Sequence, residues 1–245
     1  LRKNRIDSGL FLAEGMRVCK QAISSGWIPK YVIFNSEDEA VKDTKLIIDE
    51  CIENNGYVLK VSLKILSKIS RKENPQTILC VFERKFEEVK NVDEGSSLAW
   101  VVLDRIRDSG NLGTIIRTCD ATGVNGLILI DDCCDPFSPE TVRASMGAIF
   151  AIKIILMRHE EFLDWIVNKD NKVVGTTLSA STIYTDINWG ETPILLMGNE
   201  QSGITEELEG KTDINIKMPM KGSSDSLNLS VSTGVFLYEI LRKKE

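Results

Sequence analysis

The sequence predicts an α/β protein of two domains. Strand and helix patterns alternate along nearly the whole chain of 245 residues. The strands of the second part are more hydrophobic than those of the first, as expected for a parallel sheet that is covered on both faces. A polar stretch over residues 89–97, with one glycine and two serines, separates the two parts. We therefore predict a first domain over residues 1–90, a linker over 91–97 and a second domain over 98–245.

In the first domain, short apolar runs alternate with amphipathic ones, which predicts a small α/β sandwich. The expected strands cover residues 9–13, 31–34, 57–61 and 78–82. The expected helices cover residues 14–25, 39–54 and 63–69.

In the second domain, the expected strands are residues 98–103, 126–130, 152–156, 173–177, 194–197 and 214–218. The expected helices are residues 112–122, which Gly123 ends, then 139–150, 160–168 and 227–242. This alternation places ligand chemistry at the carboxyl ends of the strands.

Composition excludes several classes of site. Hydrophobic residues make up 42% of the chain, enough for a substantial core, and the net charge is −6. The six cysteines form no C-x-x-C pair, so we expect neither disulfides nor a zinc site. The one histidine, His159, stands beside two glutamates and is interpreted as a surface residue, which argues against histidine triads and histidine-bound metals. Neither a membrane span nor a secretory leader is visible, and we expect a cytoplasmic protein without a bound metal.

The negative net charge argues mildly against a nucleic-acid partner, because lysine and arginine supply much of the affinity for phosphates. Basic residues nevertheless gather in the first third of the chain. One group contains Arg2, Lys3, Arg5 and Arg17, and a second lies within residues 60–72. Either group alone is typical of a solvated helix face, but both fall where a module that holds an RNA substrate could sit.

The first candidate site segment covers residues 103–117, a strand followed by a glycine-containing turn and the start of a helix. Asn111 is suited to cap that helix, and Gly113 lets a ligand or a backbone approach closely. Arg117 lies four residues after Gly113, so it points back along the first turn. By itself, the segment is equally compatible with a capped helix that carries a surface arginine.

The second segment runs from an apolar strand, residues 193–197, into the turn Gly198-Asn199-Glu200. It delivers a carboxylate and exposed backbone groups to the carboxyl end of a sheet. Tight turns at strand ends are common, so this tripeptide alone is weak.

The third segment passes from a strand through a Gly/Ser loop into a helix whose first turn presents Ser226, Asn228 and Ser230. Unpaired N–H groups at a helix N-terminus suit a polar ligand. The same pattern also fits a flexible serine-rich loop before a capped helix.

Taken in order, the three segments resemble the motifs of the TrmH/SpoU branch of the SPOUT RNA methyltransferases: Asn-x-Gly-x-x-x-Arg, then Gly-Asn-Glu, then Pro-Met followed by Ser-Leu-Asn-x-Ser-Val. The resemblance covers residues 98–242, and Arg-Ala-Ser-Met-Gly-Ala at 143–148 resembles the family's helix between the first two motifs. Residues 11–15, with the basic residues before them, resemble less specifically the L30-like (L30e-like) RNA substrate-binding domain that often precedes the catalytic one.

The resemblance implies a C-terminal SPOUT domain with a mostly parallel sheet and a deep trefoil knot, a rare exception to the rule against knotted chains. It also implies a homodimer with sites at the subunit interface and S-adenosyl-L-methionine as cofactor. The backbone around five residues is expected to hold that cofactor: Thr176, Gly198, Asn199, Met218 and Leu227. Position 218 is more often isoleucine in the family, which matters only if the side chain packs on adenine.

The implied reaction is methyl transfer to a ribose 2′-hydroxyl of RNA, and the implied catalytic residues are Arg117, Asn111, Glu200, Ser226 and Asn228. A ribose hydroxyl is scarcely ionised at neutral pH, so positioning and charge stabilisation should dominate. Arg117 is expected to grip the phosphate next to the target ribose, with Glu200 orienting its guanidinium. The remaining three residues are expected to fix the ribose and the loop geometry.

Ribosomal RNA is the expected substrate because of the L30-like domain, and transfer RNA is the second candidate. A Rossmann-type enzyme is disfavoured because no G-x-G-x-x-G motif follows the early strands. Two more classes of protein stay open: a SPOUT enzyme that methylates a base nitrogen, and a noncatalytic RNA-binding factor that kept the fold. The joint presence of Asn111, Arg117, Glu200 and Asn228 argues against a decayed site. No DNA or membrane partner is expected.

Overall fold

The computed structural model describes residues 2–70, 73–91 and 97–245. The chain divides into two compact units. Unit 1 contains Leu1–Lys85 together with Asp135–Ala151, and unit 2 contains Phe86–Cys134 and Ile152–Glu245. Most of the predicted linker, residues 92–96, lies outside the described residues, as do Arg71 and Lys72 of the second basic group.

Unit 1 is built on a mixed four-stranded sheet in the order β1-β4-β2-β3. Its strands are β1 (Leu10–Glu14), β2 (Tyr31–Asn35), β3 (Tyr57–Val61) and β4 (Ile78–Glu83). Strand β4 pairs antiparallel with both β1 and β2, whereas β2 and β3 are parallel. The helices of the first 85 residues are α1 (Arg2–Ser8), α2 (Met16–Ser24), the 3-10 helix η1 (Ser36–Asp38), α3 (Lys42–Glu53) and α4 (Leu63–Ser70).

An aromatic cluster explains why Asp135–Ala151 belongs to unit 1. This segment holds α6 (Pro139–Ala144) and the 3-10 helix η3 (Ala148–Phe150). The ring of Phe137 lies 4.5 Å from that of Phe11, and the ring of Phe150 lies 5.2 Å from that of Trp27. Trp27 Nε1 also donates to the Phe150 carbonyl at 2.9 Å. Burial of such rings contributes about 1.5–3 kcal/mol each, which is enough to fix the segment on the unit.

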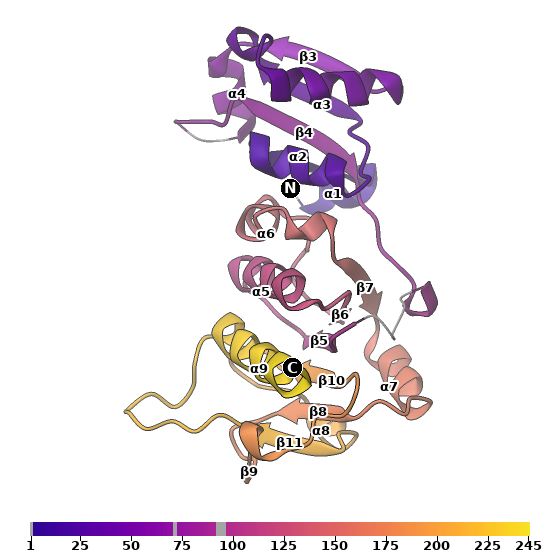
Figure 1. The fold of residues 1–245 in the computed structure, drawn as a ribbon, viewed down its shortest axis with the longest axis vertical. Helices are drawn as coiled ribbons and strands as arrows, with labels where there is room; N and C mark the ends of the chain where they lie inside the picture. Colours follow the sequence, from indigo (N-terminus) through magenta and orange to yellow (C-terminus); the bar gives the residue numbers. More distant parts are fainter. Residues whose placement is uncertain (1, 71–72, 92–96) are drawn as a thin grey trace. The chain divides into compact units, whose positions relative to one another are not determined.

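Unit 2 is a seven-stranded sheet in which every pair is parallel, in the order β7-β6-β5-β10-β8-β11-β9 (Figure 1). The strands are β5 (Trp100–Asp104), β6 (Gly126–Ile130), β7 (Lys153–Met157), β8 (Val173–Thr176), β9 (Thr182–Ile183), β10 (Ile194–Met197) and β11 (Ile214–Lys217). All residues of β5, β6 and β10 are buried, as expected for strands covered on both faces.

The helices of unit 2 are α5 (Ser109–Thr122), α7 (His159–Val167), α8 (Glu206–Glu209) and α9 (Leu229–Lys244), with 3-10 turns η2 (Val89–Asn91) and η4 (Tyr184–Asp186). Helices α5 and α9 pack side by side (Figure 1). The core contains Trp100, Val102 and Ile128 from the sheet and Phe162 from α7. None of the described helices combines the length and apolar surface needed to span a lipid bilayer.

The predicted α/β fold with a parallel second sheet is confirmed, and the bounds of β3, β6 and β10 are as predicted. The helix predicted over residues 139–150 is wrong as one element. Met146 and Gly147 take left-handed conformations, with φ of 53° and 101°, and separate α6 from η3. The short elements α1, β9 and α8 were not predicted. The knotted passage of the chain stays a prediction.

Candidate active site

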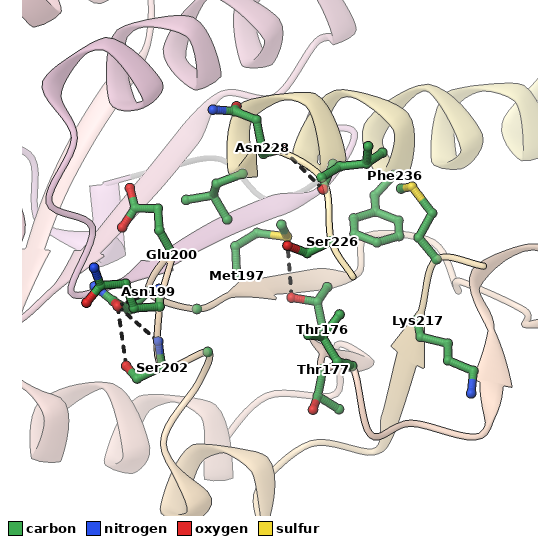
Figure 2. A pocket seen from close by; sticks show the side chains of 18 of the residues that line it. Thr176, Thr177, Met197, Asn199, Glu200, Ser202, Lys217, Ser226, Asn228 and Phe236 are labelled. Atoms are coloured by element: carbon green, nitrogen blue, oxygen red, sulfur yellow. Dashed lines mark hydrogen bonds between the residues drawn. The ribbon is translucent and has the colours of Figure 1, made fainter. Parts of the chain in front are cut away.

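A cavity of about 620 Å³ lies at the carboxyl ends of β8, β10 and β11, beside the start of α9. Figure 2 shows Thr176 at the end of β8 with Thr177 after it, Asn199 and Glu200 after β10, and Asn228 at the start of α9, all around this space. Its walls are formed by Asn111, residues 176–179, 197–203, 216–218, Met220, 226–229, Ser232 and Phe236. The cavity is of the size and place expected for a ligand site in a parallel α/β sheet.

One wall of the cavity is a tight turn from Asn199 to Gly203. The two residues exchange backbone hydrogen bonds of 3.1 and 2.9 Å. The Asn199 side-chain oxygen accepts from the backbone N–H groups of Gln201 and Ser202, at 3.0 and 3.2 Å. Only glycine fits at Gly198, because a Cβ there would lie 2.1 Å from the Gly203 carbonyl carbon. The turn is therefore held firmly against the end of β10.

The loop between β5 and α5 lies against this turn. The Asn199 amide nitrogen donates to the Arg105 carbonyl at 2.8 Å. Helix α5 is capped by Asp108, whose carboxylate accepts from the Asn111 backbone N–H at 2.6 Å. The prediction that Asn111 caps this helix is therefore wrong. The helix begins three residues earlier than predicted, at Ser109, and the Asn111 side chain is left to face the cavity.

A chain of hydrogen bonds joins the three predicted motifs. The Glu200 carboxylate accepts from Asn111 Nδ2 at 3.3 Å, and from the backbone N–H groups of Arg107 and Asp108 at 3.4 Å. The Asn111 oxygen accepts in turn from Asn228 Nδ2 at 2.9 Å. Side chains that are 89 and 117 positions apart in the chain thus meet in one polar array.

The last member of this array, Asn228, caps α9. Its oxygen accepts from the backbone N–H groups of Ser230 and Val231, at 2.9 and 3.4 Å, and from the Ser230 hydroxyl at 2.6 Å. A single side chain therefore fixes the first turn of the helix through its oxygen and contacts Asn111 through its nitrogen. Ser226, two residues earlier, also lines the cavity (Figure 2).

The remaining walls suit a ligand with an apolar part and no phosphates. Met197, Ile216 and Phe236 supply apolar surface, and Thr176 donates its hydroxyl to the Leu196 carbonyl at 3.1 Å. Glu200 and Lys217 are the only charged residues among those that form the walls. A single lysine is a poor match for the several negative charges of a di- or triphosphate. A ligand that carries an amino group, a carboxylate and a sulfonium has a net positive charge, which suits a wall with one carboxylate.

All five predicted cofactor residues, Thr176, Gly198, Asn199, Met218 and Leu227, line the cavity, and so do Asn111, Glu200, Ser226 and Asn228. The sequence did not point to Met197, Ser202 or Phe236. Phe236 lies within the apolar pattern of α9, where nothing distinguishes a side chain that faces a ligand from one that fills the core.

Arg117 is placed differently. Its side chain is exposed on α5, does not line the cavity, and makes no hydrogen bond or ion pair within the described residues. The predicted hydrogen bond from Arg117 to the Glu200 carboxylate is wrong for a single copy of the chain, because Glu200 accepts from Asn111 and the loop backbone instead.

The predicted RNA-binding residues differ in exposure. Arg2, Lys3 and Arg17 are exposed on unit 1. Arg5 is half-buried and its Nε donates to the buried carboxylate of Asp135 at 2.7 Å. We therefore assign Arg5 to the packing of α1 within unit 1 and withdraw it from the RNA-binding set.

In the part of the chain that the structure describes, the other titratable groups do not assemble into a second kind of site. All six cysteines are free, and burial raises the pKa of the Cys133 thiol to about 11 and that of Cys134 to about 12. His159 is mostly buried rather than free on the surface, and its Nε2 lies 3.0 Å from a Glu207 carboxylate oxygen. Among the described residues, no three His, Cys, Asp or Glu side chains are grouped to hold a metal ion.

Comparison with known families identifies both parts of the chain. The model of the SpoU rRNA Methylase family matches residues 99–238, and that of the MRM3-like substrate binding domain matches residues 1–80. A curated relative is the 23S rRNA (guanosine(2553)-2′-O)-methyltransferase RlmP of Bacillus subtilis. It is 30% identical over 239 residues, which cover 98% of this chain and 91% of the relative.

Solved structures agree over the full length. An rRNA methyltransferase from Sinorhizobium meliloti with bound AdoMet is 37% identical, with a TM-score of 0.92, covering 99% of this chain and 91% of that one. The SpoU methyltransferase AviRb from Streptomyces viridochromogenes, in complex with the cofactor AdoMet, is 25% identical, with a TM-score of 0.87 and coverages of 100% and 94%.

Proposed function

The chain belongs to the SpoU rRNA methylase family, and from this premise we propose that it transfers a methyl group from S-adenosylmethionine to a ribose 2′-hydroxyl of ribosomal RNA. The observation that carries the proposal is the polar array of Glu200, Asn111 and Asn228 at the rim of one cavity. In our view residues 98–245 carry out the transfer, and residues 1–90 hold the RNA through exposed cations such as Arg2, Lys3 and Arg17.

S-adenosylmethionine, when bound, supplies a methyl group on a sulfonium, a leaving group that is already activated. We assign its adenine and ribose to the cavity walls around Thr176, Gly198, Met218 and Leu227, where apolar side chains and strand-end backbone groups alternate. The turn that begins at Asn199 forms one side of this space. The protein thus contributes orientation rather than a covalent step.

The residues of the polar array have complementary tasks. Asn228 and Asn111 hold the start of α5 at a fixed distance from the start of α9. Glu200 ties the loop between β5 and α5 to the turn after β10. This geometry presents the Ser226 hydroxyl and the Asn111 amide to the target ribose of the RNA when that ribose enters the cavity. Because a ribose hydroxyl is a weak nucleophile, fixed dipoles and in-line placement are the main catalytic contributions.

We further propose that the enzyme is a homodimer and that Arg117 serves the cavity of the partner subunit. Arg117 is exposed on α5, which packs against α9. The outer side of α9 exposes Val231 and Tyr238, each more than half accessible, on one face of the helix. A second copy would cover this apolar stripe and receive Arg117, whose guanidinium suits the phosphate beside the target ribose.

Mixing two inactive variants tests this arrangement. In the proposed dimer each site combines Asn228 of one subunit with Arg117 of the other. A mixed dimer of Arg117→Ala and Asn228→Ala subunits therefore has one complete site and one that lacks both residues. Because about half of the dimers are mixed after exchange, an equal mixture should recover about a quarter of the wild-type activity. Size measurement by light scattering gives the subunit number. A monomer, or no recovery in exchanged dimers, would contradict the proposal.

Ribosomal RNA is the proposed substrate because two relatives that match nearly the whole chain, from Bacillus subtilis and Sinorhizobium meliloti, are rRNA methyltransferases by name. Purified protein would be incubated with labelled S-adenosylmethionine and either deproteinised ribosomal RNA or transfer RNA. We expect a 2′-O-methylated nucleoside from ribosomal RNA only. Labelled transfer RNA would support transfer RNA as the substrate, a methylated base would contradict ribose chemistry, and cofactor binding without transfer would support a noncatalytic RNA-binding factor.

We also propose that the enzyme acts in the cytoplasm. Its cysteines are free thiols, five of them buried, and such thiols persist in a reducing compartment.

A further inference from the structure

Arg105 is an unusual residue for its position. It follows β5 directly and has φ of 54°, a left-handed conformation that side chains with a Cβ seldom adopt. Strain of this kind costs about 1 kcal/mol or more and persists only where the surroundings hold it. Glycine or asparagine would relieve the strain, so the arginine side chain must supply a contact that they cannot.

The guanidinium of Arg105 is anchored on a buried carboxylate. Its Nε and Nη2 each donate to an oxygen of Asp104 at 2.9 Å, and the Asp104 side chain has no exposed surface. Hydrogen bonding to Asp104 also raises the pKa of the guanidinium. A bidentate pair of this kind fixes the plane of the guanidinium.

The same guanidinium reaches the cavity wall. Arg105 Nη2 donates to the Gly203 carbonyl at 3.3 Å, while the Arg105 carbonyl accepts from Asn199 Nδ2 at 2.8 Å. One residue therefore contacts both the first and the last residue of the turn that forms a wall of the cavity. Gly203 itself has φ of 67°, and its carbonyl group lies close against Gly198. The hydrogen bond from Arg105 adds to this close packing and fixes the end of the turn.

We propose that Arg105 is a positioning residue, held by Asp104, that fixes the Asn199–Gly203 turn and so preserves the cofactor cavity and the placement of Glu200. This inference rests on the proposed function, because it assigns the cavity to S-adenosylmethionine. Arg105 acts through the turn and does not contact the cofactor, since it does not line the cavity. Substitution of Arg105 leaves the catalytic residues themselves unchanged, but the Asn199–Gly203 turn, which forms a wall of the cavity, becomes mobile.

Arg105→Lys is the main test, because lysine keeps a charge beside Asp104 but cannot bridge to Gly203 in the same geometry. Calorimetric titration with S-adenosylmethionine should show affinity reduced about tenfold, which corresponds to about 1.4 kcal/mol. In steady state, KM for the cofactor should rise by a similar factor while KM for RNA stays the same. Asp104→Asn should give a smaller loss of the same kind, because an amide offers the guanidinium one oxygen instead of two.

Arg158→Lys is the matched control. Arg158 is an exposed arginine whose Nε and Nη2 both donate to one oxygen of Glu161, at 3.1 and 3.0 Å, and it is hydrogen-bonded to no residue of the turn. Its cofactor affinity should equal that of the wild type. If wild-type protein fails to bind S-adenosylmethionine, the proposed function fails. If the wild type binds and Arg105→Lys binds equally well, or loses only RNA affinity or only thermal stability, the positioning role is overturned.

Discussion

Asn228 performs two tasks with opposite ends of one amide, and substitution can separate them. Its oxygen caps α9, and its nitrogen donates to Asn111 Oδ1 at 2.9 Å. Asn228→Asp keeps an acceptor for the helix N-terminus, where a negative charge is also favourable. It removes the donor and places a carboxylate opposite the Asn111 oxygen. Asn228→Ala removes both functions.

The magnitudes follow from the contacts. Loss of an N-cap costs about 1 kcal/mol, and loss of one hydrogen bond between side chains costs about 0.5–1.5 kcal/mol. Asn228→Ala should therefore lose about 2 kcal/mol, a fall in Tm of roughly 4–8 °C for a protein of this size. Asn228→Asp should lose less than Asn228→Ala, about 0.5–1.5 kcal/mol, because it keeps the cap and loses the bond to Asn111. Both variants should lose methyl transfer at least about tenfold if the amide array positions the ribose.

Thermal unfolding and methyl transfer, measured on the same preparations, give both quantities. Ser138→Ala is the control, because Ser138 caps α6 in unit 1 by accepting from the Thr141 N–H at 3.2 Å. It should lose stability but keep its activity per folded molecule. An Asn228→Asp enzyme as active as the wild type would refute the role assigned to the array. An Asn228→Ala enzyme with unchanged Tm would refute the capping energy.

Three further outcomes are expected. Gly198→Ala should abolish S-adenosylmethionine binding in a titration, because its Cβ would lie 2.1 Å from backbone atoms of Gly203 and Ile204; normal affinity would contradict the tight turn. Arg117→Lys should lower kcat by about tenfold or more while the cofactor affinity is kept, since lysine lacks the fork for bidentate phosphate contact, and near wild-type turnover would exclude that contact. The free energy of unfolding should fall as the pH rises from about 9 towards 11, because burial raises the pKa of Cys133 to about 11 and the unfolded chain releases that proton first. Denaturant titrations of wild type and Cys133→Ala measure this slope, and an equal slope in both would contradict the assignment to Cys133.

The sequence allowed prediction wherever one residue pattern had one structural solution. The apolar runs of β6 and β10 could only be buried strands, and their bounds agree with the prediction. The residue that caps a helix is less clearly determined by the sequence. Asp108 and Asn111 both favour helix N-termini, and the sequence does not say which of them starts α5, so the cap was assigned three residues late. Short elements such as α8 lack the periodicity on which prediction depends.

Contacts between segments that are distant in the sequence could not be predicted, for a different reason. The attachment of Asp135–Ala151 to unit 1 depends on Phe137 and Phe150 meeting Phe11 and Trp27, a matter of packing that no local pattern encodes. The three motif segments could be expected to meet, because strand ends share one edge of a parallel sheet. Which side chains then bond to one another, such as Glu200 to Asn111 instead of Arg117, required coordinates.

The most direct test of the account is a map of ribose 2′-O-methylation in the ribosomal RNA of cells that lack this protein. We predict that one site, methylated in the parent cells, loses its methyl group, and that wild-type protein restores it whereas Arg117→Ala and Asn228→Asp do not. An unchanged ribose map, or restoration by both variants, would contradict the central claim that this cavity and its amide array methylate ribosomal RNA.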